Sequence, residues 1–161
     1  MRIIILSDSH GNERVLENIA KKEEKAEIFV HLGDTEPEVS AFMRKHPSVD
    51  FRYVRGNNDY NSTAPTQLVV DVPGARIFCV HGNRHGVYYG VEKLTAIAAN
   101  LNCNVACFGH THRYFQDYID GIHVLNPGSC AKPRDSLVPS YAFIDVTPAG
   151  IVIGKKDITY S

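Results

Sequence analysis

The stretch that decides the fold is Phe108-Gly109-His110-Thr111-His112, which directly follows the apolar residues 105–107. Residues 105–108 read as a short buried strand. Gly109 then frees the backbone, and His110 and His112 are expected on the same side if the chain stays extended, because side chains alternate along a strand. Two neutral imidazoles there could bind one metal ion or two neighbouring ions. A metal site requires matching ligands elsewhere in the chain.

Four other apolar strands of the sequence also end in polar residues that lie next to glycine or in a turn. Because the carboxyl ends of strands in an open α/β sheet face one crevice, such endings can converge although they lie far apart in sequence. Glycine in these turns lets the backbone come close to a bound ion or phosphate. The four endings are Asp8-Ser9-His10, Gly33-Asp34, Gly56-Asn57-Asn58-Asp59 and His81-Gly82.

The first part of the chain alternates apolar strands with helices that have one apolar face. Strands are predicted at residues 2–6, 26–32 and 50–55, and helices at residues 12–25 and from residue 36 to just before Pro47. Asn12 is a suitable cap for the first helix. In the second helix, Val39, Phe42 and Met43 are expected to point inward. This order of strand, helix and strand predicts right-handed βαβ crossovers.

The later part of the chain changes to antiparallel pairing. Residues 66–72 and 75–80 flank Pro73-Gly74 as a predicted hairpin, and residues 92–101 form a third predicted helix. After Arg113 only strands are expected, at residues 114–119, 122–125, 140–146 and 151–156. We therefore predict an α/β layered sandwich, in which two mixed β-sheets pack face to face and helices flank them. With no linker or internal repeat, residues 1–161 are expected to form one domain.

Composition and charge exclude several classes of function. A net charge of −1 leaves no broad basic face, so nucleic acid is not the expected partner. The apolar run at residues 3–6 is far too short for a signal peptide core or a membrane span, which predicts a cytoplasmic protein without a membrane partner. The four cysteines show no paired CxxC spacing and are expected to be buried, reduced thiols.

The strand endings together supply seven candidate metal ligands. Four are imidazoles, two are carboxylates and one is an amide, which is too many for one tetrahedral ion and suits two ions that share a bridging carboxylate. Two divalent cations beside two carboxylates would leave a local positive excess that attracts a phosphate. The candidates are Asp8, His10, Asp34, Asn57, His81, His110 and His112.

These segments resemble the motifs of the calcineurin-like metallophosphoesterase superfamily, in the same order and over essentially the whole chain. The segments LSDSHGN, HLGD, VRGNND and FGHTH are most similar to those of the small bacterial and archaeal phosphodiesterases within this superfamily. The resemblance implies an αββα fold. It further implies one metal held by Asp8, His10, Asp34 and His112, and a second held by Asp34, Asn57, His81 and His110.

The activity implied by the resemblance is hydrolysis of a small phosphate ester by water activated between two divalent ions, with Asp34 bridging them. One departure concerns Asn58, because many members of the superfamily carry histidine at that position to assist the phosphoryl group or the leaving group. An amide can donate a hydrogen bond but cannot deliver a proton near pH 7. The enzyme should therefore favour good leaving groups or use another acid, such as His85 or a metal-bound water.

Several residues beside these motifs have expected roles in substrate binding or in support of the site. The family frequently has the motif HGH after the hairpin, and in this chain Asn83 replaces the second histidine of that motif. Asn83, Asn58 and Arg134 are candidate substrate contacts. Arg134 could clamp a phosphate oxygen, and Arg55, directly before Gly56, is a similar candidate. Asp59 is expected to orient a histidine ligand rather than to bind metal. A role as a buried structural histidine is expected for His31.

The leading hypothesis is thus a two-metal phosphodiesterase. The mixed oxygen and nitrogen ligands suit Mn²⁺, Fe²⁺, Ni²⁺ or Zn²⁺, with Mn²⁺ the first choice. One rival is a nuclease, which the missing basic groove disfavours. A second is a non-catalytic interaction module, since a subunit of the eukaryotic retromer coat resembles this fold. A purely structural metal site is the third rival. A homodimer built on the late strands is also expected.

Overall fold

The computed structural model describes residues 1–35 and 37–159 of the chain. Within them lie ten strands and three helices. The strands are β1 (Arg2–Leu6), β2 (Ile28–His31), β3 (Phe51–Tyr53), β4 (Gln67–Val72), β5 (Ala75–Val80), β6 (Val105–Cys107), β7 (Tyr114–Ile119), β8 (Ile122–Pro127), β9 (Ser140–Thr147) and β10 (Gly150–Asp157). The helices are α1 (Glu13–Lys22), α2 (Glu38–Lys45) and α3 (Glu92–Asn100).

The strands form two five-stranded mixed sheets. The first sheet has the order β10-β9-β1-β2-β3, and the second has the order β4-β5-β6-β8-β7. Strands β1, β2 and β3 pair in parallel, as do β5, β6 and β8, while the hairpins β4–β5, β7–β8 and β9–β10 pair antiparallel. The parallel parts of the two sheets carry all five predicted strand endings.

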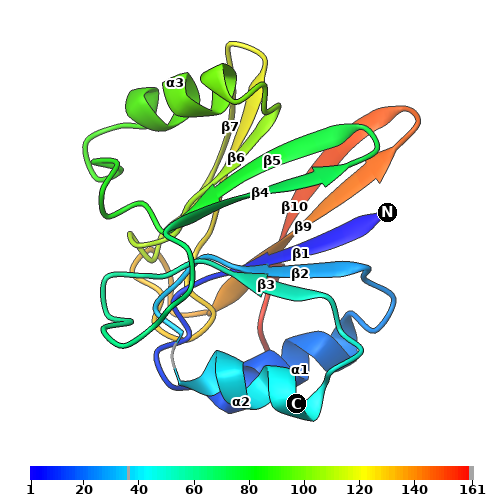
Figure 1. The fold of residues 1–161 in the computed structure, drawn as a ribbon, viewed down its shortest axis with the longest axis vertical. Coiled ribbons are helices and arrows are strands. Elements are labelled where there is room, and N and C mark those ends of the chain that lie inside the picture. The colour runs from blue at the N-terminus through cyan, green and yellow to red at the C-terminus, as the bar shows by residue number, and fades with distance from the viewer. Residues whose placement is uncertain (36, 160–161) are drawn as a thin grey trace.

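The layers follow the order helix, sheet, sheet, helix. Figure 1 shows α1 and α2 below the first sheet, and α3 on the opposite side of the molecule above the second sheet. Apolar clusters separate successive layers: one holds Ile4, Leu16 and Phe42 beneath the first sheet, and another holds Phe78 and Leu94 beneath α3. The predicted fold class, a layered α/β sandwich with helices outside, is confirmed.

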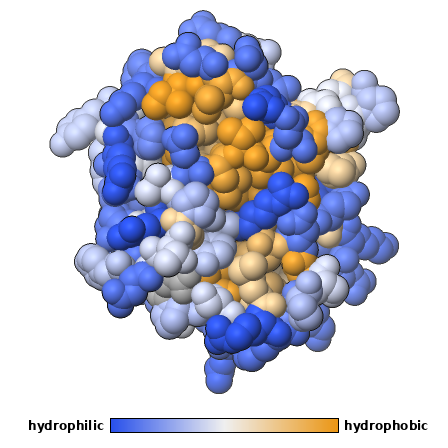
Figure 2. All heavy atoms as spheres, in the orientation of Figure 1, coloured by the Kyte–Doolittle hydropathy of each residue, from blue (hydrophilic) through white to orange (hydrophobic). Residues whose placement is uncertain are grey.

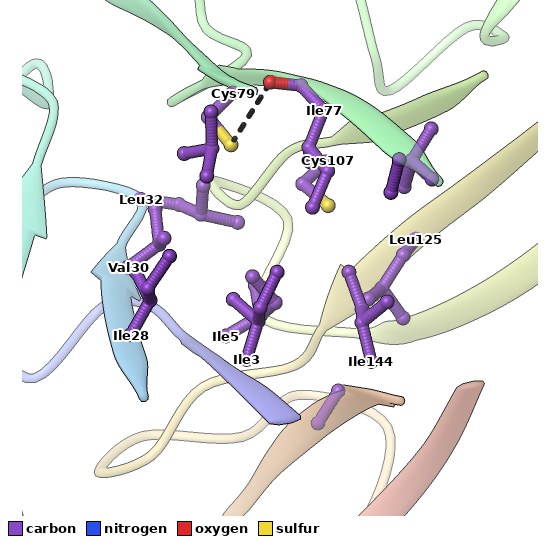
Figure 3. Packing of buried hydrophobic residues seen from close by; sticks show 14 of the residues in the cluster. Ile3, Ile5, Ile28, Val30, Leu32, Ile77, Cys79, Cys107, Leu125 and Ile144 are labelled. Atoms are coloured by element: carbon purple, nitrogen blue, oxygen red, sulfur yellow. Dashed lines mark hydrogen bonds between the residues drawn. The ribbon is translucent and has the colours of Figure 1, made fainter. Parts of the chain in front are cut away.

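The main core lies between the two sheets. In Figure 3, Ile3 and Ile5 of β1 point toward Ile77 of β5 and Cys107 of β6, which lie across the interface. Full burial of each aliphatic side chain stabilises the fold by about 1.5–3 kcal/mol. All four cysteines are buried and free, as predicted. This core holds the two sheets in a fixed relative position, so the loops that follow the strands are attached to a rigid framework.

The helices differ from the sequence prediction in two details. Asn12 caps α1 as expected, with its Oδ1 accepting a hydrogen bond from the Val15 amide, but α1 ends at Lys22 rather than at residue 25. Met43 is exposed on α2, so its predicted inward orientation is wrong. Only one face of this helix of eight residues meets the first sheet, and Val39 and Phe42 occupy that face. The predicted start at Glu36 lies outside the described residues.

The helix α3 leaves part of the second sheet uncovered. Figure 2 shows an apolar area on the surface between α3 and the β4–β5 hairpin. Partly buried residues packed against the cluster beneath α3 include Val69, Ile97 and Leu101.

Among the described residues, no helix combines the length and apolar character needed to cross a membrane.

Candidate metal centre

The candidate site lies where loops from both sheets meet. The endings of β1, β2 and β3 come from the first sheet, whereas those of β5 and β6 come from the second. These loops gather at the left of the view in Figure 1. The convergence expected for one open sheet is therefore produced by two stacked sheets whose parallel strands end at the same edge of the sandwich.

The backbone of these loops is unusual. Five of the seven candidate ligands belong to three loops, and each of the five has a left-handed backbone. The φ values are 57° at Asp8, 45° at His10, 57° at Asp34, 69° at His110 and 58° at His112. Such a conformation costs a residue with a side chain roughly 1–2 kcal/mol, and strain of this kind concentrates at functional sites.

The left-handed turns correct one expectation. Residues 110–112 do not stay extended, so the two imidazoles do not share one side as on a regular strand. His112 Nε2 lies 3.2 Å from His10 Nε2, whereas the ring of His110 lies 5.1 Å from the ring of His81. The loop thus sends its two histidines to opposite parts of the site.

One group of ligand atoms surrounds Asp8. Its Oδ1 lies 3.3 Å from His112 Nε2 and 3.9 Å from His10 Nε2. Its other oxygen, Oδ2, accepts hydrogen bonds from the Ser7 hydroxyl at 2.6 Å and the His110 amide at 3.1 Å. Oδ1 is buried and accepts no hydrogen bond from the described residues. A buried carboxylate oxygen without a donor beside two imidazoles suits a cation.

A second group surrounds Asp34. Its Oδ1 lies 3.6 Å from His81 Nε2, and its Oδ2 lies 3.7 Å from His10 Nε2. His81 Nε2 also lies 2.8 Å from Asn57 Oδ1. Because Asp34 faces histidines from both groups, it occupies the position between them. Each of the sets Asp8-His10-His112 and Asp8-Asp34-His81 places its ligand atoms within 4.8 Å of one another.

Hydrogen bonds to the backbone orient two of the imidazoles. His81 Nδ1 lies 2.7 Å from the carbonyl oxygen of Leu32, and His112 Nδ1 lies 2.7 Å from that of Lys132. A carbonyl accepts, so each Nδ1 carries the proton and donates it. In the neutral ring the Nε2 lone pair is then free and directed at the carboxylates, as a metal-ligating histidine requires.

The surroundings of the site shift the pKa of one carboxylate and of three histidines. Burial lowers the pKa of His10 and of His110. Burial also acts to raise the pKa of Asp8, but the adjacent His112 and His81 rings and the hydrogen bond from Ser7 outweigh it and lower that pKa. Burial acts to lower the pKa of His112, but the adjacent charge of Asp8 raises it overall. A charged Asp8 beside neutral His10 and His110 has the ionisation states that bind divalent cations.

Buried side chains of the turn at residues 126–129, a segment whose sequence resembles a turn that borders the site in this superfamily, hold these loops. The Ser129 hydroxyl donates to the Asp8 carbonyl at 2.8 Å. Asn126 Nδ2 donates to the Gly109 carbonyl at 2.9 Å and lies 3.0 Å from the Thr111 hydroxyl. The turn at residues 126–129 therefore does more than reverse the chain. The residue types in NPGS indicate a turn, but they do not identify these contacts.

Asp59 connects two loops of the site. Its carboxylate accepts hydrogen bonds from the backbone amides of Asp34, Thr35 and Gly56, at 2.7–2.9 Å. Its position within the loop after β3 lets it bind the loop after β2, which runs alongside. Asp59 thereby ties the loop that carries Asn57 to the loop that carries Asp34. The expected role of orienting a histidine ligand stays a prediction.

A buried network fixes the loop after β1. Gly33 donates its amide proton to His31 Nδ1 at 3.1 Å, so the ring proton is on Nε2, which donates to the Ser9 hydroxyl at 2.9 Å. Ser9 in turn donates to Glu38 Oε1 at 2.6 Å, and the same oxygen accepts the Gly11 amide. His31 is fully buried, so the predicted structural role is confirmed. The Ser9 oxygen accepts a hydrogen bond from His31, so this histidine does not act as a base that would activate Ser9 as a nucleophile.

We expect His31 to make folding stability depend on pH. Burial lowers its pKa from 6.5 to about 3, so between these values the unfolded chain binds a proton that the folded chain does not. Its contribution is complete above pH 6.5 and is lost as the pH falls toward 3, by about 2 kcal/mol at pH 5. Urea unfolding of wild type and His31→Gln at pH 7 and pH 5 measures this change.

The variant His31→Gln should lose less stability than wild type over that pH interval. His123→Gln is the control, because burial also lowers the pKa of His123 but that ring lies partly exposed on β8 beside Tyr118. It should change the pH dependence less than His31→Gln does. An identical pH dependence in wild type and His31→Gln would contradict the assignment.

Gly56 is required by close packing against Asp34. A Cβ at this position would lie 2.2 Å from Asp34 Oδ1 and 2.3 Å from the Asp34 amide nitrogen. Gly56→Ala is expected to displace the carboxylate, to weaken metal binding by at least about 10-fold and to destabilise the fold by about 1–3 kcal/mol. Calorimetric metal titration and urea unfolding measure the two effects.

The matched control is Gly121→Ala in the turn between β7 and β8. Gly121 has a φ of 84°, and nothing lies within 4 Å of an added Cβ. This variant carries backbone strain without a clash, so it should lose stability and keep its metal affinity. Equal metal affinity in the two variants would show that Gly56 does not position Asp34.

The other predicted site residues lie around this centre. Asn58 donates from its amide and from Nδ2 to the two oxygens of Asp34, at 2.9 and 2.7 Å. Asn83 and His85 line a cavity that also contains Asn57 and His81. The Arg134 guanidinium donates to the Tyr88 hydroxyl at 2.7 Å, and the Tyr88 ring lies 5.1 Å from that of His110. Arg134 is thus at the rim, outside the cluster of carboxylates.

Several known proteins resemble this chain in sequence. The family model of the calcineurin-like phosphoesterase superfamily domain matches residues 1–148. The probable metallophosphoesterase YsnB of Bacillus subtilis is 33% identical over 146 residues, which cover 89% of this chain and 83% of that protein. Vacuolar protein sorting-associated protein 29 of Schizosaccharomyces pombe is 24% identical over 167 residues, with 95% and 89% of the two chains covered.

A solved structure shows the same fold. The crystal structure of a conserved uncharacterized protein, a predicted phosphoesterase from Streptococcus pneumoniae, superposes with a TM-score of 0.77 at 24% identity. The match covers 96% of this chain and 97% of the other.

Proposed function

The chain belongs to the calcineurin-like phosphoesterase superfamily, and on this premise we propose that it is a metal-dependent phosphodiesterase that hydrolyses a small phosphate ester. We further propose residues 1–161 as its single catalytic domain. Cytoplasmic location and a homodimer stay predictions.

The observation that carries the proposal is the pair of buried carboxylates that face imidazole nitrogens from both sheets. Asp8, His10, Asp34 and His112 are proposed to hold one ion, and Asp34, Asn57, His81 and His110 the other. The unsatisfied Oδ1 of Asp8 and the orienting bonds at His81 and His112 support this assignment. The donor set suits Mn²⁺ best, with Fe²⁺, Ni²⁺ or Zn²⁺ as alternatives.

The ions, when bound, would lower the pKa of an attacking water and neutralise charge on the phosphoryl oxygens. The protein's own residues would orient the reactants. Asn58 is held against Asp34 through its main chain and side chain, so its amide is fixed beside the proposed bridging carboxylate. We propose that this amide donates to a phosphoryl oxygen, a role that needs no proton transfer.

Departure of the leaving group is the step for which this chain has no obvious proton donor, because Asn58 occupies the position of the histidine found in many family members. Burial, with the nearby charges of Lys93 and Arg84, lowers the pKa of His85, so the ring is mainly neutral at pH 7. A neutral imidazole can still donate one hydrogen bond. We therefore propose that His85 and Asn83 contact the leaving group, that Arg134 contacts substrate at the rim, and that leaving groups of low pKa are preferred.

The test is hydrolysis of an aryl phosphodiester by purified protein. After removal of metal with a chelator, activity should be absent and should return when Mn²⁺ is added. Full activity in the chelated protein would contradict the proposal. Elemental analysis of the purified protein should find about two divalent ions per chain.

A second candidate function is a non-catalytic interaction module. The similarity to vacuolar protein sorting-associated protein 29 favours it, because that name describes a sorting-associated protein and not an enzyme. The two functions differ in turnover: a module would show metal binding and thermal stabilisation by metal, with no hydrolysis of aryl monoesters or diesters under any metal.

A further inference from the structure

A polar cavity beside the proposed metal centre has features that point to a specific class of leaving group. Its volume is about 350 Å³. It shares Asn57 and His81 with the metal centre, so a phosphoryl group held there would have one substituent directed into it. The remaining lining comes from the loops after β3 and β5 and from the start of β4: Arg55, Gly56, Thr66, Gln67, Gly82, Asn83, Arg84 and His85.

The charge of this cavity has one sign. Two guanidinium groups, those of Arg55 and Arg84, line it, and no acidic side chain lies among its described lining residues. Lys93 adds a third cation nearby, because its Nζ donates to the Arg84 carbonyl at 3.0 Å. Guanidinium groups are preferred partners of carboxylates and phosphates, since they offer several donors in one plane.

Neither guanidinium is occupied by an acidic partner within the described part of the chain. Arg55 Nη2 donates to the Tyr60 carbonyl at 3.3 Å, which leaves its other donors available. Other arginines of the protein do have carboxylate partners, such as Arg2 with Asp145 and Arg52 with Asp50. The two arginines of the cavity are therefore available for an external anion.

The other lining groups favour the same kind of occupant. Thr66, Gln67 and Asn83 provide neutral hydrogen-bonding groups, and His85 has a buried Nδ1 that finds no partner in the described residues. Tyrosine and phenylalanine are absent from the described lining, whose side chains are all polar or charged. A compact polar group fits this chemistry better than a flat apolar one.

We propose that this cavity binds a second anionic group of the substrate, a carboxylate or a phosphate carried on the leaving-group side of the phosphodiester. This inference rests on the proposed function and deepens it by naming the substrate class. Arg55 and Arg84 provide the charge, and they act as specificity residues rather than in the chemical step.

The test compares two diesters that differ only in charge. Methyl 3-carboxyphenyl phosphate carries the additional anion, and methyl 3-carbamoylphenyl phosphate is its neutral counterpart of nearly equal size. With the Mn²⁺-loaded protein, kcat/KM should be at least about tenfold higher for the carboxylate, the effect of one charge-assisted hydrogen bond. Arg55→Met and Arg84→Met should each bring this ratio toward one.

The control variant is Arg44→Met, which removes an exposed arginine of α2 that does not line the cavity. It should keep the wild-type ratio. A third diester with a phosphonomethyl group at the same ring position shows which anion is preferred. Preference for either anion supports the proposal, and the order of the two identifies carboxylate or phosphate chemistry.

A binding measurement without turnover separates this inference from the proposed function. In NMR titrations of the metal-free protein, 3-hydroxybenzoate should shift the amide signals of Gly56, Gly82 and Arg84 at lower concentration than 3-hydroxybenzamide does. If neither diester is hydrolysed, the proposed function fails, and the titration still decides whether the cavity binds anions. Equal rates for both diesters and equal affinity for both phenols would overturn the inference.

Discussion

Replacement of Asp34 by asparagine is expected to lower metal-dependent hydrolysis of an aryl phosphodiester by at least about a thousandfold, beyond the 10–100-fold typical of groups that only orient a ligand. Asp34 is 3% exposed and has His10 Nε2 and His81 Nε2 within 3.7 Å on its two oxygens. An amide of the same shape keeps the packing but removes the charge that would bridge two cations. The side-chain NH₂ group of the new asparagine could also face Nδ2 of Asn58, which in the wild type donates a hydrogen bond to Asp34 Oδ2.

The measurement is kcat/KM at saturating Mn²⁺, together with the metal content of the variant. Asp157→Asn is the matched control, since this carboxylate is 54% exposed at the end of β10 and pairs with Lys155. It should have wild-type activity and two ions per chain within error. Asp34→Asn with more than about a tenth of wild-type activity would rule out the bridging role.

The second large effect concerns the two histidines after β6. His112→Ala should lose the ion beside Asp8 and His10, and His110→Ala should lose or weaken the ion beside His81. Each variant should therefore retain about one ion per chain, because each histidine serves a different group of ligands. Hydrolysis should fall by at least about 100-fold in both, since the proposed reaction uses both ions together.

Elemental analysis after gel filtration measures the metal content, and His123→Ala is the control. The His123 ring contacts Tyr118 on the second sheet and does not belong to either group. Two ions retained by both variants would refute the ligand assignment. The loss of both ions from each variant would indicate that the two histidines are ligands of one shared site.

Much of this protein can be predicted from local sequence. The apolar runs before Ser7, Gly33 and Gly109 mark buried strands, and the polar residues after them mark the strand ends at which ligands gather. Asn12 marks the start of α1 correctly. These features are local because periodicity and capping depend on residues within one or two turns. Met43 was mispredicted because a helical face in a sequence does not reveal how far the neighbouring sheet extends.

The orientation of the ligands depends on long-range contacts. A left-handed backbone at His110 and His112 turns the two imidazoles apart, and residues distant in sequence hold that loop: Asn126 through Gly109 and Thr111, and Asp8 through the His110 amide. Asp59 likewise binds amides of another loop, those of Asp34 and Thr35. None of these partners can be identified from spacing.

The sequence by itself determined which residues could bind metal and that they lie at strand ends, because residue type and hydrophobic pattern are local properties. Tertiary structure alone decided that the five endings come from two stacked sheets, and that Asp34 lies between the two groups of histidines. It also placed Arg55 and Arg84 in one cavity beside them. Strand order and loop packing arise from burial of the shared core, which involves the whole chain at once.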